Sequence, residues 1–273
     1  MSTKESAAAF QALHEGPGIF VMPNPWDVGT ARVLAGLGFE ALATTSQGLA
    51  NSLGMPDGDV RRKLHLRHAR EIVDATPLPV NGDLENGYGD DPDTVAQTIK
   101  KAAKAGLVGC SIEDASKNPD EPIYPLDQAV KRIKAAAKAA RKLSFPFVLT
   151  ARAENYLYGR VDLADTIARL QAYEEAGADV LYAPGLRDIE EIRKVCDALS
   201  KPVNVLALKG GPSVAELGEA GVRRVSLGSN LHRVATGAFL RGAKELKEQG
   251  TLGFLDGAAT TAELEPFLSS PHS

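Results

Sequence analysis

The sequence is poor in cysteine, in aromatic residues and in long apolar runs. Its 273 residues include two cysteines, which cannot build a disulfide framework and fit a reducing compartment. Only 5% of the residues are aromatic, which disfavours an aromatic-rich β sandwich. No segment reaches the roughly 18 apolar residues of a membrane span, and the first 18 residues hold no apolar run typical of a signal peptide. We therefore expect a cytoplasmic protein with no membrane partner.

Neither sign of charge dominates, and two phosphate-binding fingerprints are missing. The 31 basic and 35 acidic residues give a formal net charge of −4, which offers no general attraction to nucleic acid. The Lys-rich stretch 131–142 alternates with alanine, as on the solvated face of a helix. Neither a Gly-x-Gly-x-x-Gly sequence after the first predicted strand nor a Gly-Lys-Ser/Thr loop is present. A doubly wound open sheet is therefore the less favoured α/β alternative.

One sequence pattern recurs along the chain: a predicted helix ending in Ala-Gly, then a short gap, then an apolar run rich in β-forming residues. Glycine after a helix ends it in the left-handed conformation, so each occurrence of the pattern marks the passage from a helix to a strand, an Ala-Gly joint. The four joints begin at Ala35, Ala105, Ala176 and Ala220.

Four further apolar runs bring the predicted strands to eight, alternating with helices. These runs are 19–22, 79–82, 145–150 and 202–206, and helices are predicted at 93–105, 127–142, 162–176, 189–199 and 231–249. Eight alternating units in a chain near the roughly 250 residues of a (β/α)8 barrel predict that fold. We expect one domain, with the barrel at about 18–235 and C-terminal helices at about 231–268, the last beginning near Ala262.

Polar residues follow the first five predicted strands, at the ends where barrels of this type carry their active sites. They are Asn24 and Asp27, then 44–47, Asp83 and Glu85, Glu113 and Asp114, and Arg152 and Glu154. Because side chains alternate along a strand, Asp83 and Glu85 are expected to share one face. Neighbouring strands lie about 4.8 Å apart, so carboxylates from strands three and four are expected to converge.

A divalent cation would relieve the repulsion within such a cluster, which otherwise pushes a proton onto one carboxylate. The candidate ligands Asp83, Glu85 and Glu113 offer only oxygen atoms, which favours Mg²⁺, or Mn²⁺, over Zn²⁺. In the alternative, these acids form structural salt bridges with Arg152 and loop lysines.

Other residues near these strand ends are candidates for binding a substrate. Thr45, Ser46 and Gln47 can present hydroxyl and N–H groups to a carboxylate, or form a polar turn. The glycines of the 82–89 run indicate either close approach to a ligand or simple turns. The loop after Glu113 and the ends of strands six to eight, at Pro184, Asn204 and Ser229, are expected to contact the substituent of the substrate and so to determine specificity.

The cysteines and histidines give no support to a nucleophilic thiol or an imidazole base. Cys110 lies three residues before Glu113 in the same strand, so it is expected to face the helices as part of the core. Cys196 falls within a helical pattern. None of the five histidines is predicted at a strand end.

The ordered motifs resemble the isocitrate lyase and phosphoenolpyruvate mutase superfamily over about residues 18–235. The motifs are Asn24-Pro-Trp-Asp27, Thr44-Thr-Ser-Gln-Gly48, Ser52-Leu-Gly-Met-Pro-Asp57, Asp83-x-Glu85-x-Gly87-x-Gly89, Ile112-Glu-Asp114, Thr150-Ala-Arg152 and Ala172-Tyr-x-x-Ala-Gly-Ala-Asp179.

The resemblance implies a role for each matching position. Asp83 would coordinate Mg²⁺, with Glu85 and Glu113 holding its water ligands. Thr45, Ser46 and Gln47 would bind the carboxylate and 2-oxo group of the substrate. Arg152 would pair with a substrate oxygen, and Asp57 would lie close to the reacting centre. It also implies tetramers in which the last barrel helix is swapped between subunits.

The chain departs from this resemblance in the loop after Glu113. Isocitrate and methylisocitrate lyases carry a Lys-Lys/Arg-Cys-Gly-His gating loop there, whereas 114–122 contains no cysteine, so these two activities are not expected. The mutases and phosphonopyruvate hydrolases carry a longer loop, of which Lys117 and Asn118 are a remainder. Three hypotheses follow. The first is a Mg²⁺-dependent lyase or decarboxylase that cleaves a C–C bond of a small 2-oxo or 2-hydroxy mono- or dicarboxylic acid through a pyruvate-like enolate. The second is P–C chemistry, as a phosphonopyruvate hydrolase or phosphoenolpyruvate mutase, and the third is a barrel that binds Mg²⁺ and a metabolite without turnover.

Overall fold

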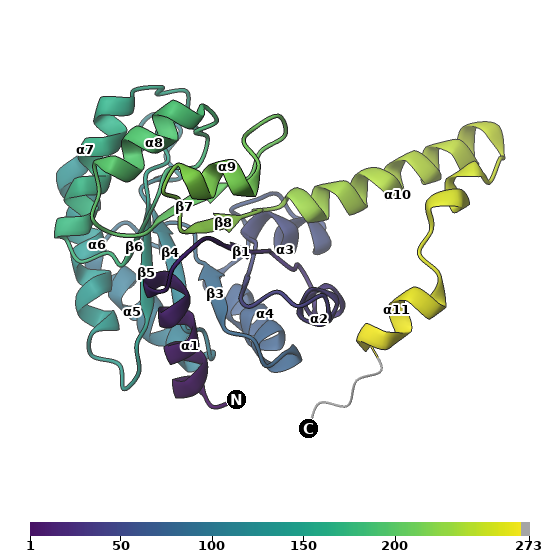
Figure 1. The fold of residues 1–273 in the computed structure, drawn as a ribbon, viewed down its shortest axis with the longest axis horizontal. Helices are drawn as coiled ribbons and strands as arrows, with labels where there is room; N and C mark the ends of the chain where they lie inside the picture. The colour runs from purple at the N-terminus through teal and green to yellow at the C-terminus, as the bar shows by residue number, and fades with distance from the viewer. Residues whose placement is uncertain (269–273) are drawn as a thin grey trace.

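Eight parallel strands form a nearly closed barrel in the computed structural model, which describes residues 1–268 (Figure 1). The strands are β1 (Phe20–Met22), β2 (Leu42–Ala43), β3 (Val80–Asp83), β4 (Gly109–Glu113), β5 (Val148–Arg152), β6 (Val180–Tyr182), β7 (Val203–Leu206) and β8 (Arg224–Ser226). Their order is β1-β8-β7-β6-β5-β4-β3-β2. The Ala43 N–H donates to the Pro23 carbonyl at 3.0 Å, which brings the two ends of the sheet together. The predicted (β/α)8 barrel is confirmed.

The helices that alternate with the strands cover the outside of the barrel (Figure 1). They are α2 (Val28–Gly36), α3 (Ser46–Ser52), α4 (Arg62–Ala75), α5 (Pro92–Lys104), α6 (Leu126–Ala140), α7 (Leu163–Glu175), α8 (Ile189–Asp197) and α9 (Val214–Glu219). Side chains of Asp27, Asp91 and Asp162 cap the first backbone N–H groups of α2, α5 and α7. Cys110 is fully buried in the core between strands and helices, as expected.

An N-terminal helix, α1 (Thr3–Glu15), lies across the N-terminal ends of the strands and is not anticipated by the periodicity of the sequence. Ala7 and Phe10 of α1 are fully buried, and they pack with the strand residues Phe20, Val148 and Val180. The helix therefore closes the bottom of the barrel. The rim at the C-terminal ends of the strands is left as the open end.

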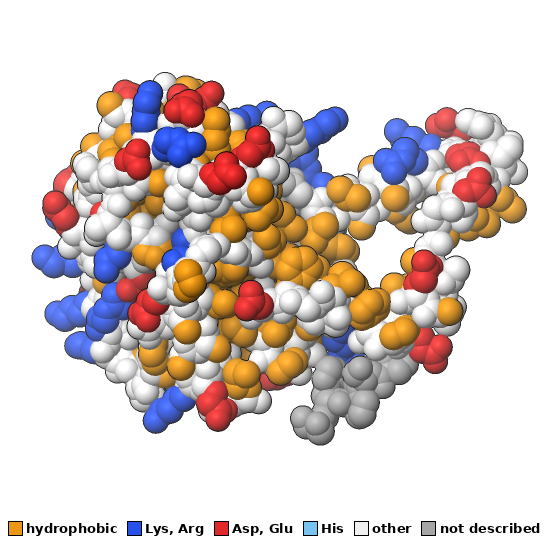
Figure 2. Space-filling model, viewed as in Figure 1, with side chains coloured by type: hydrophobic (Ala, Val, Ile, Leu, Met, Phe, Trp, Pro, Cys, Tyr) orange, Lys and Arg blue, Asp and Glu red, His pale blue; other side chains and the backbone are white. Residues whose placement is uncertain are grey.

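Beyond the barrel, α10 (Asn230–Gln249) projects as an arm, and the chain returns through η1 (Gly253–Gly257) and α11 (Thr261–Leu268) (Figure 1). Helix α11 contacts α2, where the Phe267 ring lies so close to Gly36 that a side chain there would collide with it. Phe254 packs in the same way on Gly242 of α10. Hydrophobic side chains gather between the barrel and this arm (Figure 2). Within residues 1–268 no helix is long and apolar enough to cross a membrane.

Candidate active site

The guanidinium of Arg152, at the end of β5, is the centre of a cluster of acids at the C-terminal rim of the barrel. Its Nη1 lies 2.9 Å from Asp83 Oδ1 and 3.3 Å from Glu113 Oε2, and its Nη2 lies 2.6 Å from Glu154 Oε1. The ring of Tyr182 stacks on it, with 5.2 Å between Cζ and the ring centroid. Asp83 and Glu113 thus converge from adjacent strands, as expected from the sequence.

The Asp83 carboxylate is the most strongly held acid of this cluster. Its Oδ2 accepts a hydrogen bond of 3.0 Å from the Ser46 backbone N–H. Burial pushes the pKa of Asp83 upward, but Arg152 and the Ser46 N–H outweigh that effect and hold the pKa below its usual value. Asp83 is therefore ionised at neutral pH.

Glu113 and Glu154 are harder to ionise than Asp83. Burial raises the pKa of Glu113 well above its ordinary value, although Arg152 opposes the shift, and Glu154 and Asp83 add to it. Burial also raises the pKa of Glu154, again against the pull of Arg152. One guanidinium does not neutralise three carboxylates, so this cluster favours either a shared proton or an additional cation.

Glu85 reaches the cluster by a route that the sequence did not predict. Strand β3 ends at Asp83, and Glu85 has a left-handed backbone with φ of 49°, so strand alternation does not place it. Its Oε2 pairs with Lys117 Nζ at 2.7 Å, and Lys117 also donates to the Gly58 carbonyl at 2.6 Å. The other oxygen, Oε1, is buried without a hydrogen-bond partner among the described residues. Burial raises the pKa of Glu85 in spite of Lys117.

Two adjoining cavities at the rim have opposite charge. The first, which we call the acidic cavity, measures about 410 Å³, and its charged lining is Asp57, Glu85, Glu113 and Glu154 against Lys117 and Arg152. The second, the basic cavity, measures about 380 Å³, and its charged lining is Arg152, Arg187, Arg224 and Arg233 against Asp57 and Asp83. They share Ser46, Asp57, Arg152 and Leu157. A cation suits the first and an organic anion the second.

The predicted substrate-binding residues line the basic cavity. Thr45 caps α3 by accepting from the Gly48 N–H, so 45–47 form a helix start instead of a polar turn. Gln47 accepts a hydrogen bond from the Ser229 hydroxyl, which joins the start of α3 to the end of β8. Thr45, Ser46, Gln47 and Asn204 all line this cavity.

Asn204 is held by Arg224 at the floor of the basic cavity. Arg224 Nε donates to Asn204 Oδ1 at 2.8 Å, and Asn204 Nδ2 donates to Ser226 Oγ at 3.0 Å. The guanidinium also contacts Thr150 Oγ1 and His14 Nε2, at 2.9 and 3.1 Å. Sequence reasoning missed Arg224, although a charged residue inside an apolar strand pattern is a signal for it.

Asp57 lies in the loop between α3 and α4 and lines both cavities. Partial burial of its carboxylate and the nearby charge of Asp83 raise its pKa, which Ser46 and Arg152 oppose. A carboxylic acid with a raised pKa at the junction of two cavities is a candidate for taking up and releasing a proton during a reaction.

A buried network behind the rim fixes the orientation of Glu154. The Asp114 carboxylate accepts from the Glu154 backbone N–H at 2.8 Å, from the Tyr173 hydroxyl at 2.6 Å and from Arg169 Nη1 at 3.1 Å. These contacts tie β4, the residues after β5, and α7 together. Rigid support of this kind holds active-site side chains in place.

The donor set fits a magnesium ion that keeps several water ligands. Among the described residues no three acidic, histidine or cysteine side chains already stand as a preformed cation site. The salt bridges that Arg152 and Lys117 form match the alternative given above, in which these acids only pair with Arg152 and loop lysines. The surplus of acids and the unpartnered Oε1 of Glu85 nonetheless match a hard cation, because Mg²⁺ needs only one or two direct carboxylates.

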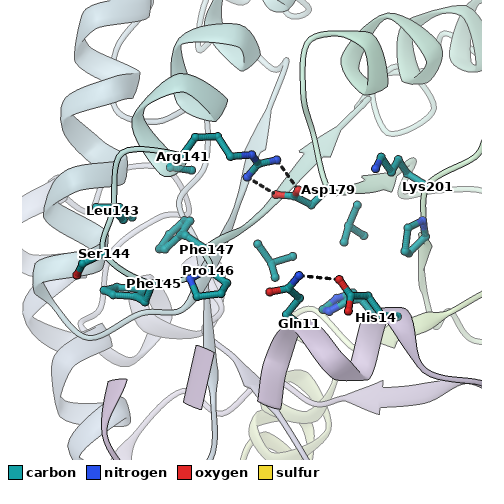
Figure 3. A pocket seen from close by; sticks show the side chains of 15 residues that line it. Gln11, His14, Arg141, Leu143, Ser144, Phe145, Pro146, Phe147, Asp179 and Lys201 are labelled. Carbon is teal, nitrogen blue, oxygen red and sulfur yellow. Dashed lines mark hydrogen bonds and ion pairs between the residues drawn. The ribbon is translucent and has the colours of Figure 1, made fainter. Parts of the chain in front are cut away.

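A larger cavity, of about 650 Å³, lies at the opposite, N-terminal end of the strands beside α1 (Figure 3). Several of its polar groups contact one another. Arg141 forms a two-pronged contact with Asp179, and Gln11 donates to Glu15 at 2.6 Å. His14, which also lines this cavity, has its pKa lowered to about 3 by burial and by Arg224. This end of the barrel lacks a convergent acid cluster.

Enzymes with a (β/α)8 barrel carry their active sites at the C-terminal ends of the strands, which is where this charged rim lies. The family model for phosphoenolpyruvate phosphomutase matches residues 10–247. The chain therefore belongs to the phosphoenolpyruvate phosphomutase family, within the isocitrate lyase and PEP mutase superfamily of lyases and mutases.

Three similar proteins illustrate the range of this superfamily. A crystal structure described as a lyase/mutase from Burkholderia cenocepacia J2315 is 55% identical, covers 98% of this chain and 97% of its own, and has a TM-score of 0.95. The structure of 2,3-dimethylmalate lyase is 29% identical with a TM-score of 0.84, covering 96% and 94% of the two chains. The Mycobacterium tuberculosis protein Rv1998c is 35% identical over 81% of this chain and 82% of its own.

Proposed function

We propose that this protein is a Mg²⁺-dependent carbon–carbon lyase or decarboxylase acting on a small 2-oxo or 2-hydroxy acid, in the cytoplasm. The observation that carries the proposal is the pair of adjoining cavities, one acidic and one basic, with Arg152 and Asp57 at their junction. The similarity to 2,3-dimethylmalate lyase supports cleavage of a carbon–carbon bond. Asp83, Glu85 and Glu113 are the proposed holders of the metal, directly or through water.

Different side chains are proposed to bind the substrate and to stabilise the charge that develops during the reaction. Thr45, Ser46, Gln47 and Asn204 bind and orient the acid in the basic cavity. In a decarboxylation, bond cleavage leaves an electron pair on the fragment that becomes the enolate of a 2-oxo acid. In the cleavage of a 2-hydroxy acid, the hydroxyl loses its proton and becomes the 2-oxo group, and the pair stays on the departing carbon next to the other carboxylate, where a proton replaces the broken bond. Arg152 faces this charge. Burial lowers the pKa of its guanidinium, but Glu154, Glu113 and Asp83 outweigh burial and raise that pKa well above the ordinary value, so the group stays protonated. Bound Mg²⁺ would add Lewis-acid stabilisation of the same oxygen atoms.

Asp57 is the proposed proton donor and acceptor. In a decarboxylation of oxaloacetate, the bond between the 3-carbon and the departing carboxylate breaks, CO₂ leaves, and its electron pair forms the enolate of pyruvate. Protonation of that enolate carbon completes pyruvate. Asp57 lines both cavities, and burial and Asp83 raise its pKa, so its protonated form persists to higher pH than that of an exposed aspartate.

The test is release of pyruvate from oxaloacetate, and of the corresponding 2-oxo acids from substituted malates, in the presence of Mg²⁺. Free Mg²⁺ decarboxylates oxaloacetate slowly, so the rate is compared with a protein-free blank and with EDTA. We expect Arg152→Met to reduce the rate by at least about 100-fold, and Arg193→Gln, on the outside of α8, to leave it unchanged. If the protein binds both Mg²⁺ and oxalate but turns over none of these acids faster than the blank, the proposal is wrong and the protein is a non-catalytic binding protein.

Chemistry at a P–C bond is the second candidate, since the matching family model is that of a phosphomutase. The short loop after β4 offers it little support, because Lys117, its one cation, is held by Glu85 and the Gly58 carbonyl. Release of phosphate from phosphonopyruvate at a rate above that of pyruvate from oxaloacetate would favour this candidate.

We also propose that a second copy of the chain covers the arm, in a helix-swapped dimer that pairs further into a tetramer. The observation that supports it is the exposure of large apolar side chains along α10. Val234 and Phe239 are 69% and 71% exposed, and Leu240 and Leu246 are each 51% exposed. An apolar helix face of this kind is typical of an interface between subunits.

A further inference from the structure

Arg224, on β8, is a fully buried cation in the interior of the barrel, and within residues 1–268 it forms no ion pair with an acid. Its guanidinium instead donates to three neutral acceptors: Asn204 Oδ1 at 2.8 Å, Thr150 Oγ1 at 2.9 Å and His14 Nε2 at 3.1 Å. Burial lowers the pKa of Arg224 to about 9, which leaves the group protonated at neutral pH. A buried cation without a counter-ion depends on each of its acceptors.

The hydrogen bonds of His14 determine which of its ring nitrogens carries the proton. Its Nδ1 lies 2.8 Å from the Phe10 carbonyl oxygen, which can only accept, so Nδ1 donates. The lone pair is then on Nε2, which accepts from Arg224. The ring packs edge to face against Phe10 and Phe20, with centroids 4.7 and 5.1 Å away. His14 is therefore a neutral acceptor held in one orientation.

Arg224 transmits this constraint to the active site through Asn204, its partner on the adjacent strand β7. Because arginine only donates, the Asn204 amide turns its oxygen to Arg224 and its nitrogen to Ser226 Oγ, which lies 3.0 Å away. Asn204 also lines the basic cavity. The orientation of an amide in that cavity thus depends on a chain of hydrogen bonds that begins on α1, at the opposite end of the barrel.

We propose that His14 is a positioning residue of the active site, because it holds the guanidinium of Arg224 in the place from which Arg224 orients the Asn204 amide. The inference rests on the proposed function, since it takes Asn204 to contact the substrate. His14 itself touches neither the substrate nor a bond that breaks. Helix α1 then has two roles: it closes one end of the barrel and supports the site at the other end.

The location of His14 allows this role to be separated from simple packing. The ring forms part of the wall of the 650 Å³ cavity beside α1 (Figure 3). The exposed side chains of Glu15 and Lys201 line the same cavity, so it is reached from the surface. Replacing His14 by alanine therefore opens the space of the ring to a small molecule from solution. Imidazole fits this space and restores the missing lone pair, whereas pyrrole has the same ring size and no nitrogen lone pair that accepts a hydrogen bond.

The test measures the dissociation constant of oxalate by calorimetry, with Mg²⁺ at pH 8, where free imidazole is mostly neutral. We expect His14→Ala to weaken oxalate binding at least about tenfold, because a buried cation loses an acceptor. Imidazole should restore the affinity to within about threefold of the wild type in the same solution, and pyrrole should not. Ala7→Gly, which loosens α1 and leaves the imidazole in place, is the matched control and should bind oxalate as the wild type does.

A second pair of variants keeps the test decisive if His14→Ala does not fold. His14→Gln keeps an acceptor near the position of Nε2, and His14→Phe keeps an aromatic ring without an acceptor. We expect His14→Gln to bind oxalate at least about fivefold more tightly than His14→Phe.

The inference is overturned if His14→Ala binds oxalate as the wild type does, if pyrrole restores binding as well as imidazole does, or if His14→Gln and His14→Phe bind equally. Failure of the proposed function gives a different result, namely no oxalate binding by the wild type. Crystal structures of the wild type and a His14 variant then decide the inference. Arg224 and Asn204 should change position when the acceptor is lost, and unchanged positions would overturn it.

Discussion

At the scale of single residues, the rim is governed by an imbalance between acids and bases. Five carboxylates surround two cations in and beside the acidic cavity when Asp83 is added to its four lining acids. The sequence predicted that Asp83 and Glu113 would converge, because regular parallel strands fix the position of their last residues. It named loop lysines as partners in the structural alternative, which Lys117 matches, but it did not predict Arg187 or Arg233, since these residues come from a loop and a helix start whose course depends on tertiary packing.

His14 gives a residue-scale prediction about stability and pH. Burial and Arg224 lower its pKa to about 3 in the folded chain, against about 6.5 unfolded, so the unfolded chain binds the proton more tightly. The stability from neutral His14 is fully present above pH 6.5 and is lost as pH falls toward 3. Glutamine does not titrate. Between pH 6.5 and 4 we therefore expect the free energy of unfolding to fall by about 3 kcal/mol less in His14→Gln than in the wild type.

Urea unfolding of the two proteins across this pH range measures the effect. Carboxylates titrate in both proteins, so the difference between them isolates His14. Parallel curves would show that the buried imidazole accepts a proton without cost, contrary to its contact with Arg224.

At the scale of elements, the Ala-Gly joints located four strands to within a few residues, because a left-handed glycine follows each helix. At the first joint the prediction was wrong in detail, since Gly36 is the last helical residue and Gly38, with φ of 89°, is the left-handed one. Gly106, Gly177 and Gly221 have φ of 88°, 102° and 94°. Helix α4 was not predicted, since its buried positions include His65, His68 and small alanines, which carry little apolar periodicity. The return of α11 onto α2 through Phe267 and Gly36 is a long-range contact that no local pattern encodes.

The start of α3 gives an element-scale prediction. Thr45→Val removes the cap on the Gly48 N–H and a hydroxyl from the basic cavity. We expect a loss of about 1 kcal/mol in the free energy of unfolding and about tenfold weaker oxalate binding. Asp91→Ala, which removes the cap of α5 at Thr94, should cost the same stability with no effect on oxalate. Equal oxalate affinity in both variants would exclude Thr45 from the binding site.

At the scale of the whole molecule, a nearly closed barrel carries an arm whose large apolar side chains are mostly exposed within residues 1–268 (Figure 2). We expect the wild type to sediment as a tetramer. Phe239→Asp should give smaller species, because it places a charge on the most exposed aromatic side chain of α10. Sedimentation velocity measures the change, and Lys244→Asp, a charge change on the same helix, is the control. A monomeric wild type would rule out the swapped arm.

The central claim is that the acidic cavity binds a hard dication beside an organic acid. Titration with Mn²⁺, followed by electron paramagnetic resonance with and without oxalate, tests this claim most directly. We expect one Mn²⁺ site per chain, with an affinity that oxalate increases. Asp83→Ala and Glu113→Gln should each decrease the affinity for Mn²⁺ at least about tenfold. Asp127→Asn, on the outer face of α6, should bind as the wild type does. Unchanged Mn²⁺ affinity in both rim variants would contradict the account.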